Sequence, residues 1–151
     1  MNLMKALDVL EKVETTLGLL YRHFSEITSD DPEVSRLFAD LADDEDSHRL
    51  SIRYQQRVAR SNAEGLNEID LDTVALSAFL ESIEKMRSTP AIDSLAALRF
   101  ARDAEVSAGE HHLKNALGTT NPEIAQLLRS LGSGDDQHLT RLKELLRERS
   151  A

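Results

Sequence analysis

Two pairs of residues in this sequence combine a carboxylate with a histidine three positions later. They are Glu45 with His48, and Asp135 with His138. On a helix this spacing places both side chains on one face, one turn apart, so both can reach one metal ion. Carboxylate oxygens can bridge two cations, and imidazole completes such a site. The pairs therefore predict metal ligands. The alternatives are chance spacing on a solvated face for the first pair and a polar kink for the second.

Two single carboxylates, Glu14 and Glu105, lie near the middle of two other helical patterns. All of these ionisable residues interrupt stripes of apolar residues spaced three and four apart, which is typical of a helix with one face in a core. Buried carboxylates at one level would repel one another and take up protons. Two bound cations would compensate their charge. The alternative is that Glu14 and Glu105 are edge residues of the core.

The same spacings recur in the two halves of the chain. Thirteen positions separate Pro32 from Glu45, and thirteen separate Pro122 from Asp135. Each half supplies one single carboxylate and one carboxylate–histidine pair. This is the ligand set of di-iron and di-manganese helical bundles.

Residues seven positions after the single carboxylates also correspond. Tyr21 follows Glu14 and His112 follows Glu105 at this distance. Tyr21 on its own is more often a core tyrosine with a satisfied hydroxyl than a redox participant. His112 could support a ligand, act as an extra ligand or lie at an interface.

The elements that would position these residues are helices. Leu, Ala, Glu and Arg dominate the sequence, and Pro and Gly cluster at a few breaks. The predicted helices cover residues 3–27, 32–59, 72–87, 89–118 and 121–149, with a break at 61–65. Short turns should make the first two and the last two helices antiparallel neighbours. We therefore expect an all-α four-helix bundle with a long crossover that contains the short third helix, which serves packing or dimerisation.

Composition narrows the function. The 151 residues suit one domain, residues 1–151, and the absence of Cys excludes iron–sulfur clusters, thiol catalysis and disulfides. A formal charge of −9 argues against nucleic acid and anionic membranes as partners. The N-terminal segment does not resemble a signal peptide, and no stretch approaches the roughly 20 apolar residues of a membrane span. A cytoplasmic location is expected.

The motifs resemble the ferritin-like superfamily and are most similar to its rubrerythrin branch. Residues 37–48 are similar to that branch's second helix, and residues 98–105 are similar to the start of its third. The resemblance covers nearly the whole chain and implies a ferritin-like bundle that holds two iron ions, with manganese or zinc as possible substitutes. The ligands that it implies are Glu14, Glu45, His48, Glu105, Asp135 and His138, with His112 as a possible addition. Tyr21 would be a phenol bonded to a ligand carboxylate.

The sequence departs from that family in four places. Asp135 stands where Glu is usual, and Gly132-Ser133-Gly134 precedes it inside a helix. This run could kink the helix or bring its backbone closer. Arg102 and Ala108 occupy the places where a second carboxylate of the third long helix would lie in peroxide-reducing members. The Cys-rich rubredoxin domain is missing, so electrons would come from a separate protein.

The expected function is a di-iron oxidoreductase, of peroxidase or ferroxidase type, that acts on peroxide or dioxygen as a homodimer. One alternative is an iron-binding or storage module without turnover. Another is a metal-free helical interaction protein with a decayed site, supported by Asp135 and the glycine run.

Overall fold

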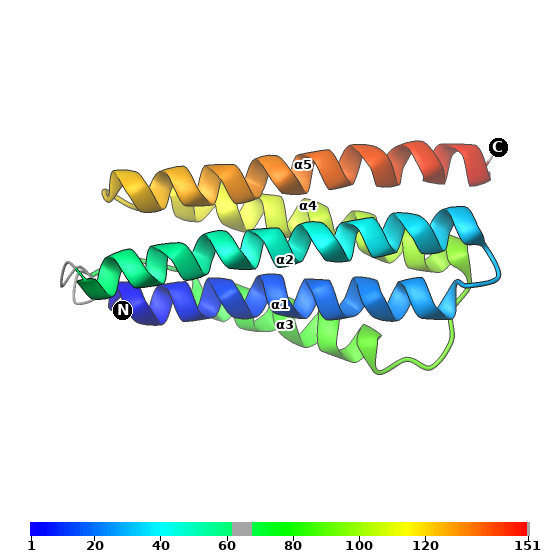
Figure 1. Cartoon of the computed structure of the whole chain (residues 1–151), viewed down its shortest axis with the longest axis horizontal. Coiled ribbons are helices and arrows are strands. Elements are labelled where there is room, and N and C mark those ends of the chain that lie inside the picture. Colours follow the sequence, from blue (N-terminus) through cyan, green and yellow to red (C-terminus); the bar gives the residue numbers. More distant parts are fainter. Residues whose placement is uncertain (62–67, 151) are drawn as a thin grey trace.

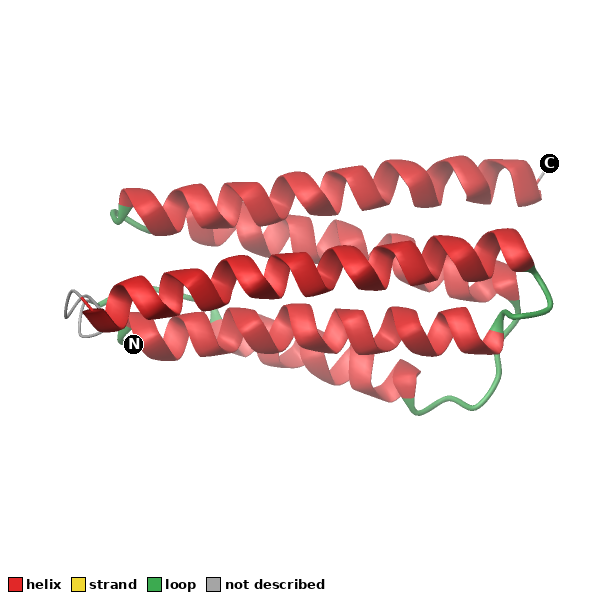
Figure 2. Ribbon diagram, in the orientation of Figure 1, coloured by secondary structure: helices red, strands yellow, loops and turns green. Residues whose placement is uncertain are grey.

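Five helices make up nearly all of the computed structural model, which describes residues 1–61 and 68–150 (Figures 1 and 2). They are α1 (Leu3–Ile27), α2 (Pro32–Ser61), α3 (Thr73–Arg87), α4 (Ser94–Gly118) and α5 (Pro122–Ser150). Of the predicted break at 61–65, residue 61 ends α2 and the remainder lies outside the described residues. None of the described helices is both long and apolar enough to cross a membrane.

The helices form two antiparallel hairpins. α1 pairs with α2, and α4 pairs with α5, while α3 lies in the connection and packs mainly against α1. This connection returns the chain along the bundle, so α2 and α4 run in the same direction (Figure 1). The predicted four-helix bundle with a long, partly helical crossover is confirmed.

Side-chain caps explain where the helices begin. Asp31 accepts a hydrogen bond from the Val34 amide, and Asn121 precedes Pro122 as predicted. The predicted start of the third long helix at residues 89–90 is wrong. The Asp93 carboxylate accepts the Ala96 amide at 2.7 Å, and this cap starts α4 at Ser94.

The core follows the predicted apolar stripes. Beyond the polar middle of the bundle, Phe24, Phe38 and Tyr21 are fully buried. The ring centroids of Phe24 and Phe38 are 5.1 Å apart, and Phe24 meets Phe100 edge-on at 6.1 Å. In the short helix, Phe79 is buried whereas Val74 is 81 % exposed. The aromatic cluster joins the two hairpins next to the polar level described below.

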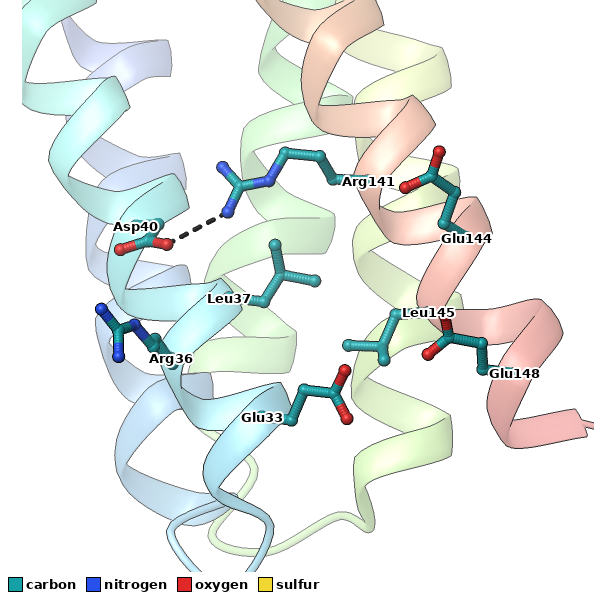
Figure 3. A pocket seen from close by; sticks show the side chains of 8 residues that line it. All are labelled: Glu33, Arg36, Leu37, Asp40, Arg141, Glu144, Leu145 and Glu148. Atoms are coloured by element: carbon teal, nitrogen blue, oxygen red, sulfur yellow. Dashed lines mark hydrogen bonds and ion pairs between the residues drawn. The ribbon is translucent and has the colours of Figure 1, made fainter.

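Ion pairs join α2 and α5 at the far end of the bundle. Arg141 Nη2 donates to Asp40 Oδ2 at 3.1 Å across a surface pocket of about 270 Å³ (Figure 3). Further along, Arg149 donates to Asp31 and Glu33. None of the predicted ligands lines this pocket. The ion pairs around it hold the two hairpins in register.

Candidate metal centre

Four carboxylates from four helices meet at one level of the bundle. Glu14 comes from α1, Glu45 from α2, Glu105 from α4 and Asp135 from α5. Each is at most 1 % exposed. Each replaces an apolar residue in the inward-facing stripe of its helix, so the same periodicity that builds the core also carries these groups into it.

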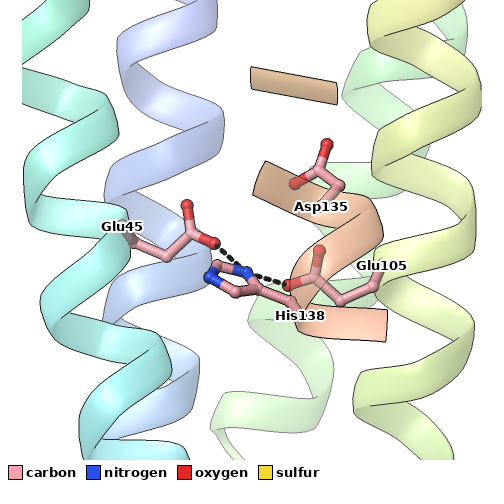
Figure 4. Close-up of side chains that lie close together, drawn as sticks. All are labelled: Glu45, Glu105, Asp135 and His138. Carbon is pink, nitrogen blue, oxygen red and sulfur yellow. Dashed lines mark hydrogen bonds and ion pairs between the residues drawn. The ribbon is translucent and has the colours of Figure 1, made fainter. Parts of the chain in front are cut away.

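Their ligand-type atoms form two groups in the described part of the chain. One group contains Glu45, Glu105, Asp135 and His138, with one atom from each within 4.8 Å of all the others (Figure 4). The second contains Glu14, Glu45 and His48 within the same limit. Glu45 belongs to both groups, and together the groups contain the six residues predicted as ligands.

The two paired histidines point their Nδ1 atoms into the centre. His138 Nδ1 lies 3.1 Å from Glu105 Oε1 and 3.3 Å from Glu45 Oε1. His48 Nδ1 lies 3.2 Å from Glu45 Oε2 and 3.5 Å from Glu14 Oε2. The rings stack with their centroids 5.7 Å apart. Each imidazole thus lies where it could bind an ion together with the carboxylates of its own group.

Tyr21 and His112 make corresponding contacts across the bundle. The Tyr21 hydroxyl on α1 donates to Glu105 Oε1 on α4 at 2.5 Å. His112 Nε2 on α4 lies 2.9 Å from Glu14 Oε1 on α1 and 3.6 Å from Asp135 Oδ2. His112 is fully buried, so it does not lie on the surface of the chain, where an interface with another protein would form. Both residues hold a carboxylate supplied by the opposite hairpin.

Glu14 and Glu45 have pKa values that are shifted in opposite directions. Burial alone raises the pKa of Glu14, but hydrogen bonds, led by those with Glu45 and His112, place it well below its ordinary value. Burial and the charge of Glu14 raise the pKa of Glu45 to about 8. At neutral pH the protein alone therefore keeps Glu14 ionised and Glu45 protonated.

Protons also compensate charge in the rest of the centre. Burial and the charge of Glu105 raise the pKa of Asp135 well above its ordinary value. Burial lowers the pKa of His48 and His138, but hydrogen bonds to the carboxylates outweigh it and raise both to about 10. In the protein alone, protons therefore compensate part of the buried charge, at positions that cations could take over.

Unpartnered oxygen atoms test whether metal ions would fit. Five buried carboxylate oxygens accept no hydrogen bond of good geometry from the described residues, although His138 Nδ1 lies 3.3 Å from one of them, Glu45 Oε1. The other four are Glu14 Oε2, Glu105 Oε2, and Oδ1 and Oδ2 of Asp135. Leaving such atoms unpaired in a core is costly. Hard cations need oxygen ligands with free lone pairs, and every one of the four carboxylates offers at least one. The residues present therefore fit a pair of metal ions.

Comparison with protein families identifies the relationship. The family model described as Rubrerythrin matches residues 5–146. The chain belongs to the rubrerythrin family. No curated protein and no solved structure gave a significant match. As a rubrerythrin family member, the chain has the bundle and the inward-facing carboxylates that its resemblance to the family implied.

The glycine run of this rubrerythrin lies against two histidines. A Cβ on Gly134 would be 2.5 Å from His48 Nε2, a distance that the ring could not tolerate in place. A Cβ on Gly132 would make only an ordinary contact of 3.8 Å with His112. α5 continues as a helix through the run. Of the two interpretations of this run, close backbone approach describes Gly134, where a larger residue would displace the His48 ring.

Sequence reasoning missed one residue that contacts the centre. Asp44 was not among the predicted ligands or their partners, but its Oδ2 lies 3.1 Å from His138 Nε2. The carboxylate is half-exposed and also lies 4.0 Å from Arg141. Its position immediately before Glu45, matching Gly134 before Asp135, was the available signal.

The two remaining histidines, His23 and His111, are partly buried. His23 Nε2 lies 2.9 Å from the Thr89 carbonyl oxygen, and the His111 ring packs 5.5 Å from Phe79. Neither histidine contacts a member of the metal groups. Both pack against the crossover.

The two departures on α4 add no carboxylate to the centre. Arg102 points outward and pairs with Asp103, and Ala108 is buried. The centre of this family member therefore contains four inward-facing carboxylates in its described residues.

Proposed function

We propose that the chain binds two iron ions and acts as a di-iron oxidoreductase on dioxygen or peroxide. One observation carries the proposal: four buried carboxylates and two histidines converge, and five of the carboxylate oxygens accept no hydrogen bond of good geometry from the described part of the chain. A metal-binding site at this level accounts for an arrangement that is otherwise unfavourable.

The residues divide the work of holding the ions. Glu14 and His48 would bind one ion, and Glu105, Asp135 and His138 would bind the other. Glu45 would bridge them because it belongs to both groups. Manganese or zinc would find the same donors acceptable, since ligand type alone does not separate these metals from iron.

Bound iron would supply the one-electron steps that reduction of dioxygen or peroxide requires. The carboxylates of the chain stabilise the higher oxidation state through their negative charge. Tyr21 fixes Glu105 and could pass its hydroxyl proton toward that carboxylate, since the hydrogen bond is already formed. Leu17, Leu41 and Ile52 belong to the buried core around this level and exclude bulk water.

Electrons would come from a separate protein, because a chain without Cys has no iron–sulfur or rubredoxin-type centre of its own. The substrate is less sharply defined. Arg102 and Ala108 stand where a further α4 carboxylate would lie, which favours dioxygen over peroxide.

Anaerobic addition of Fe²⁺ tests the proposal. We expect two ions per chain, followed on oxidation by near-ultraviolet absorption and consumption of dioxygen or peroxide. Binding of fewer than two ions, or no spectral change, would contradict it.

The two alternative functions give different results in the same experiments. A storage module would bind iron without turnover and assemble into a cage-sized particle, whereas redox work suits a homodimer. A metal-free interaction protein would show an unchanged melting midpoint with Fe²⁺ or Mn²⁺, because only ligands of the native state raise stability.

A further inference from the structure

The two paired histidines differ in what holds their outer nitrogen. Asp44 lies twelve positions after Pro32, and Gly134 lies twelve positions after Pro122, so the two residues correspond. Asp44 Oδ2 lies 3.1 Å from His138 Nε2. Gly134 offers no side chain, and its backbone lies so close to the His48 ring that a Cβ would fit only if the ring moved. One imidazole therefore has a carboxylate partner that the other lacks.

The two rings also differ in how far they are exposed to solvent. The His138 side chain is 3 % exposed and the His48 side chain is 17 % exposed. His48 also borders a surface pocket of about 520 Å³ between α2 and α5. The other residues that line it are Gln126, Arg129, Ser130, Ser133, Gly134 and Gln137. Solvent therefore reaches the His48 ring itself. A surface pocket of about 380 Å³ also borders Glu105 of the His138 group, but Glu105 and His138 both remain buried.

The number of donors follows the same division. The His138 group has three carboxylates, from Glu45, Glu105 and Asp135, and all four members are buried. The His48 group has two carboxylates, from Glu14 and Glu45. More anionic donors in a drier setting bind a cation more tightly.

A carboxylate that holds the outer nitrogen of a ligand histidine fixes the tautomer and orientation of the ring. Loss of such a partner typically lowers metal affinity about 10–100-fold. In this chain Asp44 gives that support to His138, and Arg141 lies next to Asp44 at 4.0 Å. His48 has only its Nδ1 contacts to fix it.

We propose that the two half-sites are unequal: the His138 group binds one divalent cation tightly, and the His48 group binds the second weakly and exchanges it with solvent. Asp44 is the positioning residue on the His138 side and adds to the effect of the third carboxylate and the lower exposure of that group. The inference rests on the proposed function, since it assumes that both groups bind metal.

Titration with Co²⁺, followed by calorimetry and visible absorption, tests the inference. We expect a two-step isotherm with dissociation constants at least about tenfold apart. A chelator chase should release one ion quickly and the other slowly. His48→Ala should remove the weak step and the fast phase, and His138→Ala should remove the tight step.

Asp44→Asn supplies the decisive variant, and Asp43→Asn is its matched control. Asp43 is the adjacent residue, is exposed, and pairs with Arg22 rather than with a histidine. We expect Asp44→Asn to weaken the tight step about 10–100-fold and to leave the weak step unchanged. Asp43→Asn should leave both steps unchanged. Circular dichroism of each variant without metal verifies that it is folded.

The outcomes separate the inference from the function on which it rests. Two ions bound with equal affinity, or equal weakening of both steps by Asp44→Asn, would overturn the inference and leave the di-metal function intact. An effect of Asp43→Asn as large as that of Asp44→Asn would also overturn it. Absence of Co²⁺ and Fe²⁺ binding by the unaltered protein would instead refute the proposed function.

Discussion

Replacement of Glu45 by Gln should stabilise the metal-free protein and at the same time abolish most of its response to metal. Glu45 is 1 % exposed and belongs to both metal groups. Burial and the charge of Glu14 raise its pKa from 4.5 to about 8. Gln has nearly the same shape but carries no charge at any pH.

Linkage gives the magnitude. At pH 7 an unfolded chain has lost the Glu45 proton, whereas the folded protein retains it. Each pH unit between the unfolded pKa and the working pH contributes about 1.4 kcal/mol, so the folded state is disfavoured by about 3 kcal/mol at pH 7. Glu45→Gln removes this penalty. The gain will be smaller than this ceiling, because the Gln NH₂ group cannot accept a hydrogen bond from His48 or His138 as a carboxylate oxygen can.

Urea unfolding of chelator-treated protein at pH 7 measures the effect. Glu81→Gln makes the same chemical change on an exposed position of α3 and should leave stability nearly unaltered. On addition of Mn²⁺ the unaltered protein should gain stability, and Glu45→Gln should lose most of that gain. A lower stability of the metal-free variant, or an undiminished gain with Mn²⁺, would refute the reasoning.

Three further predictions concern the stability of the protein. Because His48 and His138 have pKa values raised to about 10, the folded state holds protons that the unfolded state releases above about pH 6.5. Stability should therefore fall as pH rises from about 6.5 to 10, by up to about 1.4 kcal/mol per pH unit for each histidine, in unfolding curves recorded across that range. A flat profile would contradict the raised values. Tyr21→Phe removes the donor to Glu105 and should lower the unfolding free energy by about 1–3 kcal/mol, measured in urea; no loss would mean that Glu105 does not depend on this bond. Phe38→Ala empties part of the aromatic cluster and should cost about 3–5 kcal/mol with no change in metal stoichiometry, and a change in stoichiometry would show that the core and the centre are coupled.

Sequence periodicity was sufficient to predict most of the fold. The inward stripes of α1, α4 and α5 were predicted residue by residue, because spacings of three and four identify one helix face unambiguously. Near the end of α2 a step of three from the buried Ile52 points to Gln55, whereas Gln56 is the buried residue and donates to Asp8 and Glu11. Hydrogen bonds to α1 decide which of the two Gln residues is buried, and periodicity alone does not predict such bonds.

The candidate site was predictable where a residue lies on a stripe and unpredictable where a contact crosses between helices. Asp44 lies beside the stripe, and only the packing of α2 against α5 brings it to His138. The sequence pattern singled out Gly134, but the reason for a glycine there is its short distance to the His48 ring. The start of α4 was misplaced because Pro90 and Asp93 are both good start signals, and only Asp93 makes the capping bond.

The membership of Glu45 in the tighter metal group has a mechanical consequence. Glu45 belongs to the α1–α2 hairpin, while Glu105, Asp135 and His138 belong to the α4–α5 hairpin. A cation held by these four would cross-link residues 60 to 93 positions apart in sequence. Closing so long a loop restricts the unfolded chain, as a disulfide does in a protein that has cysteines. In this cysteine-free chain, the bound ion would be a removable staple between the two hairpins.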